Sequence, residues 1–355
     1  MSLLPPVAIR GSSLSGLAAA LSLSSLPSPP PVTLYSSPPS PPPDPHIGVG
    51  VWSTALSLLP PPLRADLSGR GAFLSAAGYR AVDGRWLHRT SLPPGRLLFL
   101  PQGELLERFE AALPPSVSRR PAAEYEGGEH GVTVGAEGAC SPTRALLHPS
   151  CPGPQPGGYH VFRGNSPHPA GEAFQTWGRG GRKRFAVVPM SAEASTWFAT
   201  VDSGLLPPSP SFDRRSFLLS HFSSFHPPVP SLISSSPPPL LSPSLSHPPS
   251  PPPSHPSLCL VGDAHRLLDP VLAMGFTLAI EDAYSLATHY PDLPAYHRAR
   301  AGRRRNAAAA SALVGALAQP SVAGVGEARD ALLGVVPGVV KGAVFDWVME
   351  ASLRG

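Results

Sequence analysis

Cysteine is scarce in this chain of 355 residues. Its three cysteines are Cys140, Cys151 and Cys259. Their spacing matches neither a zinc-binding pattern nor an even disulfide framework, which favours a reducing compartment. We therefore expect neither a metal site nor stabilising crosslinks.

Charge is also low. Asp, Glu, Lys and Arg together make up 14% of the residues, and the formal net charge is +4. No run of Lys or Arg alternates with aromatic residues, as a nucleic-acid surface would require. Two short basic clusters, 179–184 and 298–305, are expected to be solvated faces. The sequence thus argues against a nucleic-acid partner.

Long apolar runs are missing as well. None reaches the roughly 18 residues that a membrane-spanning helix needs, and the apolar segment 306–318 is too short. No basic segment precedes the first expected strand, 7–9, so a signal peptide is not expected. We expect no integral membrane segment and a cytoplasmic location, with an organelle as the open alternative.

Three common catalytic patterns are absent. The chain has no Gly-x-Ser-x-Gly elbow, no His-Glu-x-x-His helix and no Walker loop. Hydrolase and nucleoside-triphosphatase functions therefore have no support in the sequence.

Proline, by contrast, is abundant. The chain has 50 prolines, nearly three times the ordinary share of about 5%. Many lie in two Pro/Ser tracts, 27–45 and 227–256. Both tracts have few apolar residues to offset the entropy of ordering, so we expect extended, solvated loop insertions. They are interpreted as spacers, with weak docking of an SH3- or WW-type module as the alternative.

The remaining segments alternate between strand and helix patterns, which predicts an α/β fold. Short apolar or aromatic runs predict strands, and apolar residues three or four apart predict helices. Breaks in the last helical region are expected at Pro320 and Pro337. The expected strands are 7–9, 32–35, 159–163, 185–188, 196–201 and 258–261, and the expected helices are 14–26, 103–113, 276–289 and most of 293–355.

The most informative stretch runs from Leu260 to Ala283. An apolar strand leads into Asp263, and after a turn Pro270 and Gly275 open a helix. A carboxylate at a strand end can accept hydrogen bonds from hydroxyls, and free N–H groups at a helix N-terminus can meet negative charge. This arrangement suits a ligand with both hydroxyls and a pyrophosphate, although an ordinary strand–turn–helix has the same pattern.

A second nucleotide-binding pattern follows the first expected strand. Gly11, Ser13 and Gly16 occupy the three glycine positions of the dinucleotide fingerprint. In that pattern the first glycine makes the turn, the second admits the pyrophosphate, and the third lets the helix pack on the strand. Ser13 narrows the approach with its Cβ, although its hydroxyl can donate to a phosphate. An ordinary strand-to-helix turn remains the alternative for this stretch by itself.

Together, these stretches resemble the flavin-binding motifs of the FAD-dependent aromatic hydroxylases, the class A flavoprotein monooxygenases. Within that family, the sequence looks most similar to the branch of the urate hydroxylases and zeaxanthin epoxidases. Residues 134–144 match the family's Gly-Ala-Asp-Gly…Ser…Arg motif, and residues 175–201 resemble its substrate-domain sheet. The resemblance covers about two-thirds of the chain, with the motifs in the family's order.

The resemblance implies a set of cofactor-binding residues, and some depart from the family pattern. Ser36 stands at a glutamate position, Gln102 at an arginine position, and Glu137 at an aspartate position. Losing a charge-assisted hydrogen bond can cost about 1 kcal/mol or more, so weaker FAD binding is expected. No catalytic acid or base is assigned, because the cofactor carries the chemistry. The implied site comprises Gly11, Ser13, Gly16, Ser36, Gln102, Glu137, Asp263, Pro270 and Gly275.

The resemblance also implies a fold and an activity. A Rossmann-like FAD-binding domain, in segments 1–70, 101–150 and 257–355, is intergrown with a β-sheet substrate domain, and helices complete the C-terminus. The substrate domain takes 71–100 and 151–256, including the Pro/Ser-rich insertion 227–256. The implied enzyme uses FAD, NAD(P)H and O2 to hydroxylate or epoxidise a small aromatic or alkene substrate. A non-catalytic homologue with Pro-rich interaction tracts and a flavin reductase of the geranylgeranyl-reductase type remain alternatives.

Overall fold

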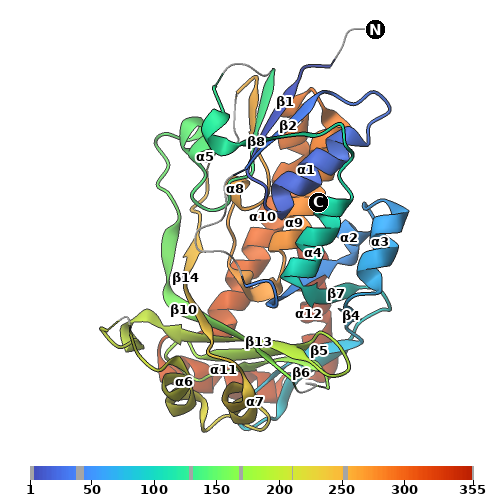
Figure 1. The fold of residues 1–355 in the computed structure, drawn as a ribbon. Helices are drawn as coiled ribbons and strands as arrows, with labels where there is room; N and C mark the ends of the chain where they lie inside the picture. Colours follow the sequence, from blue (N-terminus) through green and yellow to red (C-terminus); the bar gives the residue numbers. More distant parts are fainter. Residues whose placement is uncertain are drawn as a thin grey trace.

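The chain forms two lobes, each built on its own β-sheet and joined by long helices. A parallel sheet lies in the upper lobe of Figure 1 and a larger mixed sheet lies in the lower lobe. The computed structural model describes residues 4–36, 44–127, 131–167, 171–209, 211–250 and 255–353.

The upper sheet has five parallel strands in the order β15-β9-β1-β2-β8. Ile9 of β1 lies between Leu34 and Val134 of the neighbouring strands, and all three side chains are buried. Parallel strands covered on both faces need such apolar runs. The strands are β1 (Val7–Arg10), β2 (Val32–Ser36), β8 (Ser118–Pro121), β9 (Val132–Gly135) and β15 (Leu258–Leu260).

Apolar helices pack against this sheet. Helix α1 (Leu14–Ser24) is buried along nearly its whole length, as a helix that is apolar all round must be. It lies beside α9 (Gly275–His289) in Figure 1, and α4 (Gln102–Ala111) adds Phe109 to the same core. The sequence prediction of an α/β lobe built on a parallel, Rossmann-like sheet is therefore confirmed.

The lower sheet has seven strands in the order β14-β10-β13-β12-β11-β5-β6. Only its β11–β5 pairing is parallel among the described strands. Helices α6 (Arg214–Phe222) and α7 (Val229–Ser235) cover one face over an aromatic core that includes Phe185 and Trp197. The strands are β5 (Ala76–Arg80), β6 (Trp86–Ser91), β10 (Gln155–Ser166), β11 (Ala173–Trp177), β12 (Arg184–Pro189), β13 (Ser195–Asp202) and β14 (Leu240–Ser246).

A small antiparallel sheet connects the two lobes. It contains β3 (Gly48–Trp52), β7 (Leu97–Pro101) and β4 (Ala72–Phe73), with β7 in the centre. The Gly48 N–H donates to Thr196 Oγ1 of the lower sheet at 3.2 Å. At the other end of β3, the Trp52 N–H donates to Thr277 Oγ1 of α9 at 3.0 Å. Strand β3 is thus fixed to both lobes.

The C-terminal region is helical, with breaks near both predicted prolines. Helix α10 (Leu293–Ala318) ends before Pro320, α11 (Ala323–Val335) ends before Pro337, and α12 (Gly338–Leu353) follows. Among the described helices none is by itself long and apolar enough to cross a membrane. Helices α10 and α11 reach that length and apolarity only as a pair, and they are bent by 103°.

Shorter elements complete the chain. They are α2 (Ser53–Leu56), α3 (Pro61–Ser68), η1 (Ala122–Glu124), α5 (Pro142–Leu147), η2 (Ser203–Leu205), α8 (Gly262–His265) and η3 (Pro270–Leu272).

The expectation that 227–256 is a solvated, extended insertion is wrong for much of this segment. Helix α7 buries Val229, Leu232 and Ile233 in the lower core. Strand β14 pairs with β10 at the edge of the sheet. An edge strand tolerates Pro243 because one side of its backbone makes no ladder hydrogen bonds. Residues 251–254, and 37–43 of the first tract, lie outside the described part of the chain.

The expectation that the two basic clusters are solvated faces also needs correction. Arg300, Arg303 and Arg304 are buried, because their spacing turns them from α10 toward α9. There they bind the paired carboxylates Glu281 and Asp282. In the cluster 179–184, the last arginine is likewise buried.

Candidate active site

The turn after β1 requires glycine for steric reasons. Gly11 has φ +104°, and a Cβ there would lie 2.5 Å from the Ala136 carbonyl oxygen. A Cβ on Gly16 would lie 1.8 Å from the Gly11 carbonyl oxygen. Helix α1 therefore packs directly on the turn, in the way that the fingerprint predicted.

Ser13 precedes the first turn of α1. Its hydroxyl donates to the Ala136 carbonyl at 3.3 Å and does not cap the helix. The first N–H groups of any α-helix lack intrahelical acceptors. This helix end can therefore receive an anionic group, and Ser13 is already hydrogen-bonded to the neighbouring strand end.

The turn at Gly262, in the stretch 260–283, packs against the first turn of α1. Gly262 has φ +60°, and a Cβ there would lie 2.0 Å from Ser15 Oγ in the first turn of α1. The Gly262 N–H donates to Asp282 Oδ2 at 2.9 Å. Two stretches separated by about 250 residues in sequence thus form one site, with its turn conformation held by the buried carboxylate.

Asp263 follows Gly262 in this turn and faces the start of α9. A Cβ built on Gly275 would be 3.9 Å from Asp263 Oδ1, so the carboxylate lies beside the start of α9. Burial raises the pKa of Asp263, and the nearby positive charge of Arg304 opposes that rise. In the described part of the chain, no protein hydrogen bond occupies the Asp263 carboxylate, which is open to a ligand.

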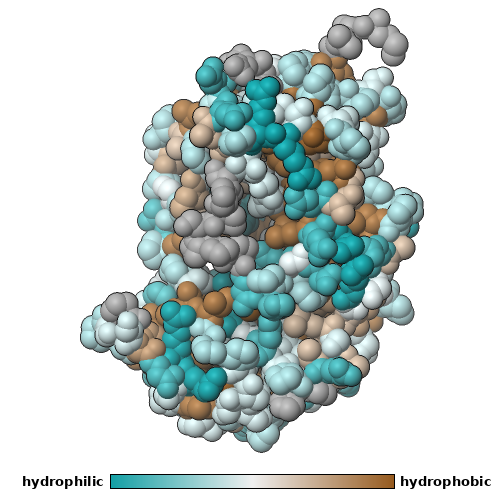
Figure 2. Space-filling model, viewed as in Figure 1, coloured by the Kyte–Doolittle hydropathy of each residue, from teal (hydrophilic) through white to brown (hydrophobic). Residues whose placement is uncertain are grey.

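A cavity of about 770 Å³ begins at this turn and extends to the lower sheet. Gln102, Asp263, Pro270 and Gly275, four of the predicted site residues, line it. On the face drawn in Figure 2, apolar patches are exposed near the junction of the two lobes. Much of the cavity wall is apolar, including Trp52, Leu97, Phe99, Phe174, Val188, Met274 and Leu278.

An unpaired arginine faces this apolar cavity. Arg184 is 4% exposed, and its Nε and Nη1 atoms have no hydrogen-bond partner among the described residues. Burying a guanidinium without partners is costly, so the position favours an anionic or electron-rich ligand. Burial strongly raises the pKa of Tyr79, another wall residue, while Arg184 opposes that rise. The Tyr79 phenol therefore stays neutral.

A second arginine lies farther along the same wall. Arg163 Nη1 donates to Ser242 Oγ of β14 at 2.8 Å, and burial lowers its pKa. Tyr159 donates to the Asp269 carboxylate. Burial, reinforced by the charge of Asp269, raises the pKa of Tyr159 to about 12. The Pro/Ser-rich strand β14 thus contributes directly to the cavity.

Five of the predicted site residues are not part of this cavity wall. Gly11 and Ser13 precede α1 and Gly16 lies in its first turn, and the other two are Glu137 and Ser36. Glu137 accepts hydrogen bonds from Ser141 Oγ at 2.6 Å and Thr143 Oγ1 at 2.5 Å, and pairs with Arg10 at 3.4 Å. It therefore holds the start of α5 beside the Gly11 turn. Ser36 ends β2 opposite Pro121.

The sequence interpretation assigned no site role to Arg184, Arg163 or Tyr79. One signal was present: Arg184 is in phase with Ala186 and Val188 in an otherwise apolar strand, and all three line the cavity. A charge on that face of a buried strand needs a functional explanation. The other two residues carry no comparable pattern.

Comparisons with known proteins agree with this architecture. No protein-family model matches the chain. A curated protein, aurachin C monooxygenase/isomerase of Stigmatella aurantiaca, is 32% identical over an alignment of 202 residues that covers 52% of this chain and 51% of that protein. The chain thus spans about half the length of the curated relative it matches.

Solved structures match over nearly the whole chain. The Klebsiella pneumoniae HpxO complex with FAD and uric acid has a TM-score of 0.80 at 20% identity, covering 99% of this chain and 97% of that one. A salicylate hydroxylase substrate complex has a TM-score of 0.76 at 19% identity, covering 99% and 98%. The chain therefore has the fold of the FAD-dependent aromatic hydroxylases that its motifs predicted.

Proposed function

We propose that this protein is an FAD-dependent monooxygenase that uses NAD(P)H and O2 to hydroxylate or epoxidise a small aromatic or alkene substrate. The observation that carries this proposal is the continuous cavity that reaches from Asp263 and Gly275 to an apolar wall with an unpaired Arg184. The likeness to flavin-containing structures and to a monooxygenase supports it.

The residues present fit FAD. The free N–H groups at the start of α1 suit its pyrophosphate, and Asp263 can accept from its hydroxyls. The positive φ angles of Gly11 and Gly262, with no Cβ on either residue, let the two turns pack closely on Ala136 and Ser15. Gln102 lines the same cavity without the positive charge of an arginine. We infer a weaker but complete cofactor site.

The division of labour follows from the cavity wall. Bound FAD would accept reducing equivalents from NAD(P)H and would then react with O2. Trp52, Phe99 and Phe174 exclude water from the space beside it. Arg184 can bind an anionic group of the substrate and hold its ring in one orientation.

The proposed domain division is supported by the origin of the strands. All five strands of the parallel sheet come from segments 1–70, 101–150 and 257–355. All seven strands of the lower sheet come from segments 71–100 and 151–256. We therefore assign cofactor binding to the former segments and substrate binding to the latter.

The cofactor site is tested with Asp263→Ala. Purified wild-type protein should bind FAD with one-to-one stoichiometry, and this variant should lose most of the bound flavin, because a cavity-facing acceptor is removed. Asp66→Ala, which removes an exposed carboxylate paired with Arg70, is the matched control. Wild-type FAD affinity in the Asp263 variant would show that the cofactor lies elsewhere.

The activity is tested separately by stopped-flow reduction of the FAD-loaded protein. NADH or NADPH should bleach the flavin absorbance, and oxygen should then restore it. If neither NADH nor NADPH reduces the flavin at saturating FAD, the monooxygenase proposal is overturned and the non-catalytic homologue is favoured.

A further inference from the structure

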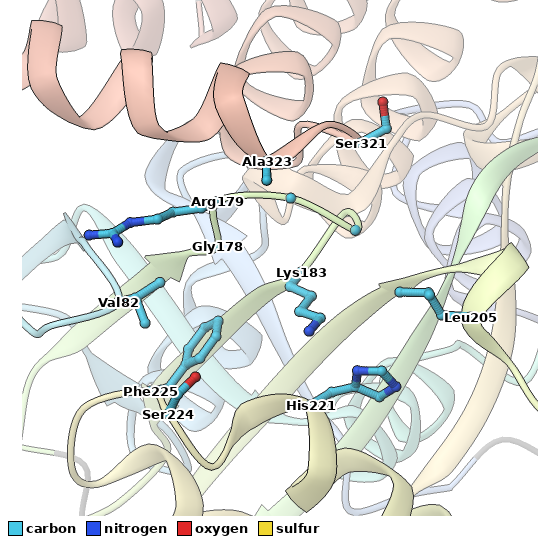
Figure 3. Close-up of a pocket in the computed structure, with 12 residues that line it drawn as sticks. Val82, Gly178, Arg179, Lys183, Leu205, His221, Ser224, Phe225, Ser321 and Ala323 are labelled. Carbon is cyan, nitrogen blue, oxygen red and sulfur yellow. The ribbon is translucent and has the colours of Figure 1, made fainter.

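A second, smaller pocket lies on the other side of the lower sheet from the large cavity. Its volume is about 520 Å³, and it is bounded by the hairpin 178–183, by the end of α6 and by the start of α11. Figure 3 shows Lys183 and His221 directed into this space and Arg179 turned away from them.

Among the described residues that line the pocket there are basic side chains and no carboxylate. Burial lowers the pKa of Lys183. Burial also lowers the pKa of His221, and the charge of Lys183 lowers it further. Arg179, the third basic residue, faces Asp330, with Nε 3.5 Å from Oδ2. Among the described residues no carboxylate lies within ion-pair distance of the Lys183 ammonium.

The remaining wall is largely apolar. Val82, Leu205 and Phe225 surround the space beside the two basic residues, and Ser224 places a hydroxyl at its rim. A fully hydrated inorganic ion would gain little from these side chains. A ligand with an apolar body and one anionic group would use both kinds of surface.

The pocket is built on rigid backbone. The Gly178 N–H donates to the Lys183 carbonyl at 2.8 Å, which closes the hairpin. The Gly181 N–H donates to Ser321 at 2.9 Å, which ties the hairpin to the segment before α11. A Cβ on Gly326 would lie 2.3 Å from the Arg179 carbonyl oxygen, so α11 packs closely on the hairpin. A preformed pocket binds without a large ordering cost.

We propose that this pocket binds a small organic carboxylate. The carboxylate group lies between the Lys183 ammonium and the His221 ring, and its apolar body lies against Leu205 and Phe225. The pocket is separate from the substrate cavity, because consecutive residues Lys183 and Arg184 line different spaces. The proposal does not depend on the proposed oxygenase activity.

Protection from acetylation provides a residue-specific test, because the chain has just two lysines, Lys183 and Lys341. Benzoate is the probe, and benzamide, with the same ring but no charge, is the control ligand. Benzoate should slow acetylation of Lys183 by acetic anhydride and leave Lys341, which donates to the Leu333 carbonyl, unchanged. Equal protection by benzamide, or none by benzoate, would overturn the proposal.

Calorimetry provides the second test. Lys183→Met keeps the length of the side chain and should weaken benzoate binding roughly tenfold or more. Arg305→Met, which removes an exposed positive charge outside the pocket, should not. In Arg184→Met, benzoate should still protect Lys183. Loss of that protection, or unchanged binding to Lys183→Met, would place the carboxylate in the large cavity or elsewhere and refute the proposal.

Discussion

Replacing Asp282 by asparagine tests whether the buried ion network fixes the turn at Gly262, where we propose that FAD binds. The Asp282 side chain is fully buried and accepts from the Gly262 N–H at 2.9 Å, Arg300 Nε at 2.8 Å and Arg304 Nε at 3.0 Å. Asparagine keeps the shape but removes the charge, and its amide turns one acceptor into a donor. Two buried guanidinium groups then lose a counter-charge.

The expected cost is large. Burial lowers the pKa of Arg304 to about 9, so this side chain is still charged at neutral pH. Removing one partner of a buried ion pair typically costs about 3–5 kcal/mol. At about 2.1 cal/mol/K per residue, the unfolding entropy of a 355-residue chain is roughly 0.75 kcal/mol/K. We therefore expect Tm to fall by about 4–7 °C.

The assay combines thermal unfolding with FAD titration. Affinity for FAD should fall with Tm, because Gly262 loses the acceptor that fixes its position beneath Ser15. Glu107→Gln is the control: its pair with Arg108 is exposed, and such pairs add little to stability. If Asp282→Asn unfolds at the wild-type temperature, the guanidinium groups are compensated in another way and our reasoning fails.

Three further predictions concern pH, packing and cofactor affinity. Burial alone would raise the pKa of Glu281, but hydrogen bonding and charge from Arg303, with the charge of Arg300, hold it below the ordinary value. The contribution of ionised Glu281 to stability is therefore complete above about pH 4.3 and is lost as pH falls through the folded-state pKa. In urea titrations, Glu281→Gln should make the free energy of unfolding depend less on pH in the acid range. An unchanged pH dependence would contradict the assignment. Ile233→Ala in α7 should lower the free energy of unfolding by about 2–4 kcal/mol, because the side chain is 1% exposed in the lower core; a neutral result in urea would restore the solvated-insertion interpretation. Combining Ser36→Glu with Gln102→Arg should tighten FAD binding roughly tenfold, because two charge-assisted contacts are restored; unchanged affinity by fluorescence titration would show that FAD lies differently from the family pattern.

Local patterns were sufficient to predict the α/β lobe and the strand and helix that flank each of its two glycine-containing turns. Strand 7–9 and the helix after Gly11 depend on apolar runs and a glycine turn, which are properties of neighbouring residues. Asp263 and Gly275 could be singled out in the same way, because Asp263 follows the end of a strand and Gly275 begins a helix. The breaks near Pro320 and Pro337 follow from the missing backbone N–H of proline. Each of these predictions needed only residues close together in sequence.

Contacts between distant segments decided the rest. The tract 227–256 resembles disordered sequence in composition, yet three apolar side chains of α7 meet a core built from other strands, and β14 finds an edge to pair with. In the sequence, the arginines of α10 resemble a surface cluster. In the fold, they pair with Glu281 and Asp282 of α9. Composition describes a segment by itself. Burial and ion pairing depend on the partner that the fold brings to it, and that partner is far away in the sequence.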